Sequence, residues 1–369
     1  MSISDRIKLY KRVEVARNRP LITYITSGRP YAGGSVGSDA VGELSRQLSA
    51  LPEECEELDL LIISNGGDPT VAWRIVSNIR ERVKFLGVLV PQAAFSAATM
   101  IALGADEIVM HPFGNLGPID SQISTAGGRG GRKRFGSEDL TATLELARKE
   151  ICGSDPDHQN AMLEVFKIVC DEVDPLAIGF TSRSIQLTNK MAKKMLSFHM
   201  SETESDRIQE IVNALHQDFF DHGYPISLTE AKEIGLKAVP PDKAVGELLW
   251  DMWLKIETEL QLRKPFSLME LVRNNPKCAA LFGDTQQVLV PQGLTPDQVH
   301  GFVDQILANT AIVDIPPTSF DVTTGLMESP RLASRCYERG MVLAQRQPDL
   351  NVVLTPITED SGWETVETS

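Results

Sequence analysis

The stretch QAAFSAATMIALGADEIVM, residues 92–110, decides the fold class of this 369-residue chain. Residues 97–105 are apolar on every side, which predicts a short buried helix. EIVM at 107–110 predicts the strand that follows it, and FLGVLV at 85–90 predicts the strand that precedes it. Because a strand, a helix and a second strand recur over about 30 residues in a βαβ unit, we expect a parallel sheet covered by helices.

The same alternation extends toward the N-terminus. LITYITS at 21–27 and LDLLIIS at 58–64 predict two further strands, each ending in a glycine turn. Ser38 or Asp39 can cap a helix that reaches about Leu48, and Pro69 suits the first position of another. Further helices are predicted over most of 160–218, over 227–236 with Ser227 and Glu230 as a capping box, and over about 244–262. These segments complete an α/β core.

A change in pattern near Lys264-Pro265 divides the chain into a core domain, 1–262, and a C-terminal extension, 263–369. The extension contains a helix capped by Thr295-Pro296, strand candidates at 288–290 and 352–354, and an acidic end, 359–369, that we expect to be frayed. Within the core, TAGGRGGRKR at 125–134 is expected to form a mobile loop, with a helix from about Ser137.

The bulk composition excludes several classes of protein. A net charge of −14 argues against a general nucleic-acid or anionic-membrane surface. Five scattered cysteines with no CxxC pair argue against structural zinc and a disulfide framework, and fit a reducing cytoplasm. The N-terminus has no apolar core of a secretory signal, and no segment reaches the roughly 18–20 apolar residues that span a bilayer. A soluble cytoplasmic protein that needs no metal or cofactor is therefore expected.

Ser96 lies where the buried helix begins, directly after a strand. Such a hydroxyl lies beside the unpaired N–H groups of the helix start, so the N–H of Ala97 could stabilise a developing negative charge. A second donor could come from the turn Gly66-Gly67, at the carboxyl end of the neighbouring strand. A serine N-cap and an ordinary glycine turn are the structural alternatives for these two features.

An ordered set of motifs adds to this interpretation: ISNGGD at 63–68, the nucleophile stretch, LGPID at 116–120, HGYPI at 222–226, and the helix with EAK at 230–232 and GL at 235–236. Over about residues 20–240 the set resembles the serine dehydrogenase proteinase (SDH) family of Clp-fold serine peptidases. The resemblance implies a ClpP/crotonase-like spiral of parallel strands with covering helices. It also implies that Ser96 is the nucleophile and that Gly67 and Ala97 supply the oxyanion hole.

The chain departs from ClpP at the base. Asp120-Ser121 stands where ClpP has its catalytic histidine, so the order Ser, His, Asp is excluded unless His111 moves into the site. The SDH family is described with the order Ser, Asp, His, which implies Asp120 as the orienting acid and His222 as the general base. Other acids remain open as alternatives to Asp120: Asp221, Asp174 and Asp106. A serine–lysine dyad, as in the signal peptide peptidases, would need Lys149 or Lys167.

The resemblance implies a serine peptidase that acts through an acyl-enzyme on Ser96. A peptide would bind as an extended strand beside Gly66-Gly67, with Gly66 and Asp68 contacting it. It also implies a homo-oligomer. Because no Walker motif is present, an ATPase or activator would be a partner chain. The run at 127–136 is expected beside the substrate groove rather than on nucleic acid. Two alternatives use the same fold: a crotonase-like enzyme acting on acyl thioesters, and a catalytically silent scaffold.

Overall fold

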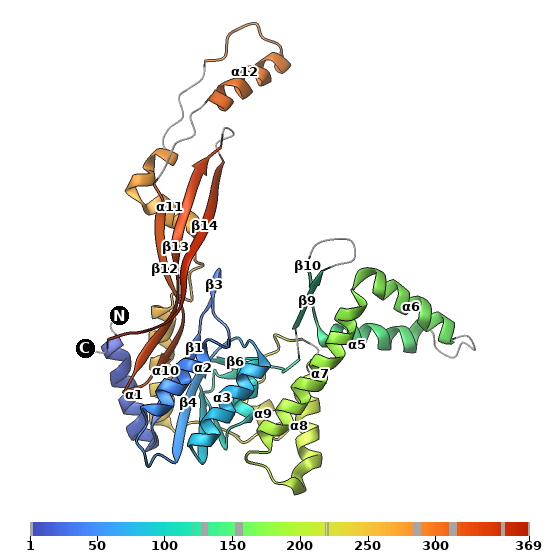
Figure 1. Ribbon diagram of the computed structural model, residues 1–369, viewed down its shortest axis with the longest axis vertical. Helices are drawn as coiled ribbons and strands as arrows, with labels where there is room; N and C mark the ends of the chain where they lie inside the picture. Colours follow the sequence, from blue (N-terminus) through green and yellow to red (C-terminus); the bar gives the residue numbers. More distant parts are fainter. Residues whose placement is uncertain are drawn as a thin grey trace.

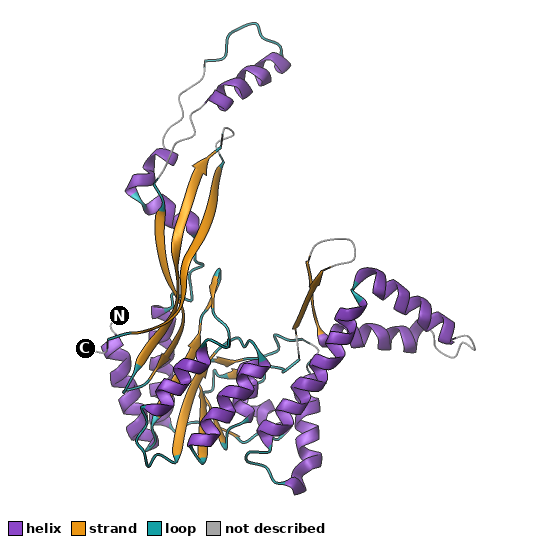
Figure 2. Cartoon of the chain, viewed as in Figure 1, coloured by secondary structure: helices purple, strands orange, loops and turns teal. Residues whose placement is uncertain are grey.

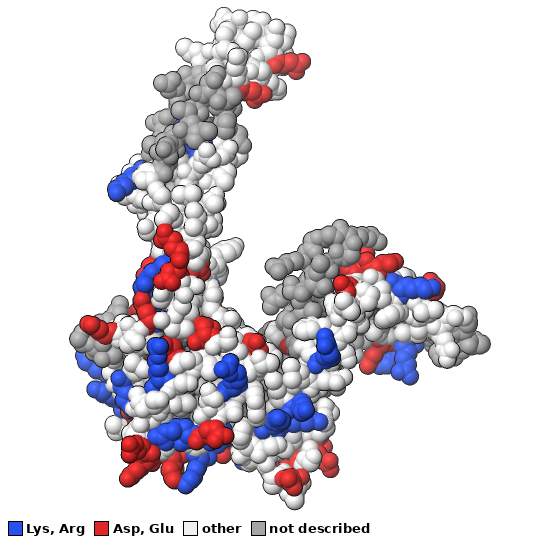
Figure 3. All heavy atoms as spheres, in the orientation of Figure 1, with Lys and Arg blue, Asp and Glu red and all other residues white. Residues whose placement is uncertain are grey.

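The computed structural model describes residues 3–120, 122–126, 132–151, 158–217, 219, 221–282, 289–309, 316–347 and 351–367. The chain forms a body from which two arms project (Figures 1 and 2). One arm is a long ribbon of C-terminal strands, and the other is helical. A space-filling view of this face shows an open gap between the arms above the body, with acidic and basic side chains interspersed over the body (Figure 3).

The body contains the parallel sheet that the sequence predicts. Five strands run in the order β11-β7-β5-β4-β1 and all pair in parallel. Their bounds are β1 (Leu21–Thr26), β4 (Glu57–Ile63), β5 (Phe85–Val90), β7 (Glu107–Met110) and β11 (Ala238–Val239). Short pairs of strands flank it: β2 (Gly28–Arg29) with β3 (Ala32–Gly33), and β6 (Ala93–Ala94) with β8 (Asn115–Leu116). The central strands are buried on both faces, which explains why they read as continuous apolar runs.

Helices cover both faces of the sheet. One face packs against α2 (Ala40–Ser49), α3 (Pro69–Arg82), α4 (Ala97–Leu103), α7 (Pro175–Leu196), α8 (Ser205–Gln217) and α9 (Leu228–Ile234). The other face packs against α1 (Ile3–Arg17) and α10 (Lys243–Glu259). The helical arm adds α5 (Ser137–Leu146), a π-helical turn (Ala147–Ile151) and α6 (His158–Glu172). The predicted helices after Asp39, at Pro69 and over 160–218, 227–236 and 244–262 are therefore confirmed.

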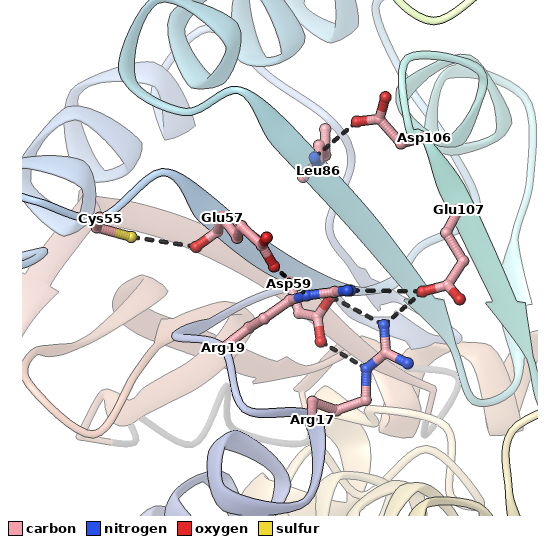
Figure 4. A network of polar contacts seen from close by, with 8 residues as sticks. All are labelled: Arg17, Arg19, Cys55, Glu57, Asp59, Leu86, Asp106 and Glu107. Atoms are coloured by element: carbon pink, nitrogen blue, oxygen red, sulfur yellow. Dashed lines mark hydrogen bonds and ion pairs between the residues drawn. The ribbon is translucent and has the colours of Figure 1, made fainter.

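A buried ion network ties the end of α1 to the amino ends of the strands (Figure 4). Asp59 on β4 is fully buried and accepts a 2.7 Å hydrogen bond from the guanidinium of Arg17, which also donates to Glu107 on β7 at 2.6 Å. A Cβ at Gly87 would lie 2.1 Å from an oxygen of Asp59, so glycine there leaves room for the carboxylate. The charged side chains at the amino ends of these strands are therefore paired with one another.

The C-terminal strands continue the same sheet. β12 (Thr318–Glu328) pairs antiparallel with β1, and β13 (Ala333–Arg346) and β14 (Val352–Thr365) follow. α11 (Leu268–Asn274) and a 3₁₀ turn (Pro276–Leu281) pack on the ribbon, and α12 (Pro296–Asn309) lies at its far end (Figure 1). The helix after Thr295 and the strand at 352–354 are confirmed. Residues 289–290 form no strand, and residue 288 lies outside the described residues.

Two predictions about loose segments are wrong. The acidic end is not frayed as far as Thr365, because β14 pairs with β13 and Glu364 accepts hydrogen bonds from Arg335 and Arg339. The glycine- and arginine-rich segment is not entirely a loop, because β9 (Gln122–Ala126) and β10 (Arg132–Gly136) form an antiparallel pair. Residues 127–131 lie outside the described residues. In both places backbone pairing with the neighbouring strand of a hairpin stabilises a polar sequence.

A second buried charge cluster joins the two ends of the chain. Glu328, 1% exposed at the end of β12, accepts hydrogen bonds from both Nε and Nη2 of Arg6, at 2.9 and 2.7 Å, and from the hydroxyl of Tyr10 at 2.5 Å. Burial, reinforced by this carboxylate, raises the pKa of Tyr10 well above its ordinary value. The cluster fixes α1 to the C-terminal ribbon.

We expect Glu328→Ala to lower the free energy of unfolding by about 3–5 kcal/mol, because it leaves the Arg6 guanidinium buried without its main counter-charge. Urea denaturation followed by circular dichroism measures the loss. Glu53→Ala, at an exposed position, is the matched control and should change stability by less than about 0.5 kcal/mol. Equal effects for the two variants would contradict the structural role of the cluster.

Candidate functional site

Ser96 has an unusual backbone conformation at the start of α4. Its φ of 53° and ψ of −117° lie in a sparsely populated region that costs about 1–3 kcal/mol for a residue with a side chain. It occupies the N-cap position, yet its side chain makes no capping hydrogen bond, and its Oγ has no partner within the described part of the chain. The hydroxyl is therefore not used to stabilise the helix.

The turn Gly66-Gly67 lies directly against Ser96. A Cβ at Gly66, whose φ is 101°, would lie 2.6 Å from the Cβ of Ser96. A Cβ at Gly67 would lie 2.5 Å from the backbone nitrogen of Val36. Both positions require glycine because another chain segment approaches them closely. The Phe95 N–H donates to the Ser64 carbonyl at 2.9 Å, which holds the two turns together.

Two backbone N–H groups beside Ser96 are left open. Val36 donates its N–H to the Gly66 carbonyl at 2.8 Å and accepts the Asp68 N–H at 2.9 Å. Because successive amides of an extended segment alternate in direction, the N–H of Gly67 points away from Val36. Among the described residues neither this N–H nor that of Ala97 has a hydrogen-bond partner. These are the two groups that the sequence predicts for an oxyanion hole.

Asp120 and His222 meet although 102 positions separate them. The ring Nδ1 of His222 lies 2.5 Å from Oδ1 of Asp120. Asp120 is 7% exposed and His222 is half-buried. A carboxylate can only accept, so Nδ1 donates to Asp120, and in the neutral imidazole Nε2 is then the proton acceptor. The contact arises because Leu116 and Ile226 exchange two backbone hydrogen bonds, at 3.0 and 2.9 Å, which align the two segments.

Thr99 links the two halves of the site. It is fully buried on α4, where its Oγ1 lies 2.7 Å from the Ala94 carbonyl and 2.9 Å from the Gly117 carbonyl, and it accepts the Gly117 N–H at 3.0 Å. The loop that carries Asp120 is thus fixed to the helix that begins at Ser96. Sequence reasoning missed this role, although a threonine in an otherwise apolar helix was a usable signal.

No hydrogen bond joins Ser96 to His222 within the described residues. The structure brings Ser96 together with Gly66, Gly67 and Ala97, and it brings Asp120 together with His222. Catalytic hydrogen bonds are often long in the absence of substrate and tighten in the complex. Ser96 and His222 therefore belong to two separate groups of contacts in the structure.

The other predicted residues have structural contacts. Asp68 caps α3, accepting the Thr70 N–H at 2.7 Å. Of the alternative acids, Asp106 pairs with Arg80 at 2.7 Å, Asp174 caps α7, and Asp221 accepts the Gly223 N–H. His111 stacks on Trp250, and burial lowers its pKa. Lys149 and Lys167 pair with exposed glutamates on the helical arm. Within the described part of the chain, the His222 ring is hydrogen-bonded to Asp120 and to none of these alternative acids.

A second histidine, His216, belongs to none of the sequence motifs and lies near Asp120. His216 on α8 is 4% exposed, and burial lowers its pKa, with the charge of Asp120 acting in the opposite direction. Burial of His216 therefore disfavours its charged form beside Asp120. Within the described residues, no group of three or more His, Cys, Asp or Glu side chains is placed to hold a metal ion, and no helix is both long and apolar enough to cross a bilayer.

The structure places a serine turn and a glycine turn at the carboxyl ends of neighbouring strands of a parallel sheet, which defines an α/β protein with its open polar groups at that end. Residues 36–129 match the family of ClpP-like SDH-type serine proteinases. The match confirms the resemblance that the motifs indicate. It contains Ser96, the glycine turn and Asp120, and it ends before His222.

The curated relatives include two uncharacterized proteins of Methanocaldococcus jannaschii. The first is 24% identical over 238 residues, which cover 63% of this chain and 72% of the relative. The second is 24% identical over 195 residues, which cover 53% of this chain and 56% of the relative. Similar solved structures include a membrane-bound stomatin-specific protease (19% identity, 40% of this chain and 71% of the other, TM-score 0.25). An enoyl-CoA hydratase from Shewanella pealeana is also similar (10% identity, 76% of this chain and 97% of the other, TM-score 0.29). These structural likenesses carry no assignment of activity.

We expect Thr99→Val to lower the free energy of unfolding by about 1–3 kcal/mol, because the buried Gly117 N–H loses its acceptor. Thermal and urea unfolding measure the effect. Thr181→Val is the matched control: Thr181 is also buried, but its hydroxyl only donates to the Ala177 carbonyl one helical turn earlier. A cost no larger than that of the control would show that Thr99 does not hold the Asp120 loop.

Proposed function

We propose that the chain is a serine peptidase that hydrolyses peptide bonds through an acyl-enzyme on Ser96. The observation that carries the proposal is the 2.5 Å contact between His222 and Asp120. It supports an imidazole oriented by an acid, with Nε2 free to accept a proton. The family match to serine proteinases supports the same reaction class.

In the proposed reaction, Nε2 of His222 takes the hydroxyl proton as Ser96 Oγ attacks the peptide carbonyl carbon. The N–H groups of Gly67 and Ala97 donate to the oxygen that becomes negative. The imidazolium, stabilised by Asp120, then gives its proton to the leaving amine. Water attacks the resulting ester by the same route and restores Ser96. No cofactor enters any step.

The backbone of the glycine turn limits how a peptide would bind. Both main-chain groups of Gly66 are already used, by Ser64 Oγ and by the Val36 N–H. The carbonyl of Gly67 faces the same side as its open N–H, and we propose that it accepts an N–H of an extended substrate. Oδ1 of Asp68 accepts the Thr70 N–H and so caps α3, which leaves Oδ2 of this exposed carboxylate for a substrate.

A fluorophosphonate probe tests the nucleophile. We expect the probe to form an adduct at Ser96 that is lost in Ser96→Ala, and to react about 100-fold more slowly or worse in His222→Ala and Asp120→Asn. Mass spectrometry of the intact protein and its peptides measures the adduct. His300→Ala, an exposed histidine on α12, is the control and should label at the normal rate.

The same assay distinguishes the two alternatives. Absence of an adduct together with saturable acyl-CoA binding would indicate a crotonase-like thioester enzyme. Absence of both would indicate a scaffold. Normal labelling in His222→Ala would retain the nucleophile and reject the histidine as its base.

We also propose that two copies associate through an exposed face of α7. Leu176, Phe180 and Leu187 on α7 are 82%, 53% and 43% exposed. At 100° per residue they lie within about 40° of one another on the helix, so they form one apolar stripe. Such a stripe on a monomer would be left in water, and a second copy can cover it with its own. A cytoplasmic location and a partner ATPase or activator stay predictions from the sequence.

Phe180→Asp should shift the protein to a smaller species, because it places an unpaired charge in the proposed contact. Sedimentation velocity at several concentrations measures the change. Ser182→Asp, exposed on α7 but off the stripe, is the control and should leave the assembly intact. A protein that is monomeric before mutation, or an assembly unaffected by Phe180→Asp, would reject this interface.

A further inference from the structure

A small cavity of about 190 Å³ lies beside the glycine turn, at the carboxyl ends of β1, β4 and β5. Thr26, Ser64 and Asn65 line it from the sheet, Gln92 lines it from the segment after β5, and Trp253 and Leu262 line it from α10 and the turn after it. Its volume corresponds to about six water molecules at roughly 30 Å³ each. The cavity is therefore large enough for one amino-acid side chain and too small for an ordinary cofactor.

The lining of this cavity is uncharged. Trp253, Leu262 and Ile63 supply an apolar wall, and the remaining side chains are hydroxyls and amides. Ser64 is 1% exposed, and its Oγ accepts from the Thr26 hydroxyl at 2.7 Å and from the Gly66 N–H at 3.0 Å. Ser64 thus joins the end of β1 and the glycine turn at the wall of the cavity. A charged side chain would lose its hydration here without finding a counter-charge.

The cavity is connected to the nucleophile through two residues. Ser64 holds the Gly66 N–H by its side chain and the Phe95 N–H by its carbonyl. Asn65, at the cavity, directly precedes the glycine that lies against the Cβ of Ser96. Because Ser64 and Asn65 line the cavity and directly precede Gly66, the cavity adjoins the turn along which we propose that the substrate binds.

We propose that this cavity is a specificity subsite that accepts one small or medium-sized uncharged side chain next to the cleaved bond, and rejects Lys, Arg, Asp and Glu. This inference rests on the proposed peptidase activity and adds its substrate class. The apolar wall takes the stem of the side chain, and the hydroxyl and amide groups take a neutral polar tip. Discrimination against a charged residue of about 100-fold or more in kcat/KM is expected.

Digestion of a peptide library by the full-length protein tests the inference, with mass spectrometry reading the residues on both sides of each cut. We expect one flanking position to lack charged residues. Gln92→Glu should admit Lys and Arg at that position with a gain of about tenfold or more. Trp253→Ala should shift the preference toward aromatic residues. Leu254→Ala, the exposed neighbour on α10, is the matched control and should cut as the unmodified chain does.

The outcomes separate the two levels of the proposal. Absence of both hydrolysis and Ser96 labelling in the unmodified chain overturns the peptidase and this subsite with it. Hydrolysis with the same flanking preferences in Gln92→Glu and Trp253→Ala overturns the subsite alone. Trp253→Phe serves where Trp253→Ala does not fold, as judged by circular dichroism, and should give a smaller shift in the same direction.

Discussion

The close approach of Gly66 to the Cβ of Ser96 is the constraint on which the rest of the site depends. With a Cβ at Gly66 only 2.6 Å from that of Ser96, neither segment could keep its position if the turn carried a side chain. The strained backbone of Ser96 is compatible with this contact because α4 and its neighbours are buried and tightly packed around it. Ser96 and the open N–H of Gly67 are thus placed by one steric requirement.

The two halves of the site differ in how firmly they are held. Ser96 is fixed by a buried helix and by the bond from Phe95 to Ser64, whereas His222 lies half-buried on a turn. Asp120, bonded to that ring, is closer to the rigid half because Thr99 anchors its loop. A turn with few buried contacts moves at a lower free-energy cost than a buried helix. Adjustment of the His222 turn is therefore the physically easier route to a contact between His222 and Ser96.

Local patterns in the sequence predicted the core of the fold, because buried parallel strands and amphipathic helices each carry their own periodicity. They failed for β14, whose exposed charges resemble a solvated tail and whose stability comes from pairing with β13 and from the ion pairs of Glu364. The contact between Asp120 and His222 has no local signal at all, since it depends on the distant Leu116–Ile226 bridge. Family resemblance supplied that pair, and Thr99, which the resemblance did not mark, was missed.

Polar groups are arranged differently at the amino and carboxyl ends of the parallel strands. At the amino ends of the strands, buried Asp59 accepts a hydrogen bond from Arg17, which also donates to Glu107 (Figure 4). At the carboxyl ends of the strands, the hydroxyl of Ser96 and the N–H groups of Gly67 and Ala97 have no hydrogen-bond partner among the described residues. Ser96 is half-buried and Gly67 is exposed, so a bound chain can reach both, whereas Ala97 is 1% exposed. The contrast between paired charges at one end of the strands and accessible, unpartnered groups at the other fits the proposal that a ligand binds at the carboxyl end.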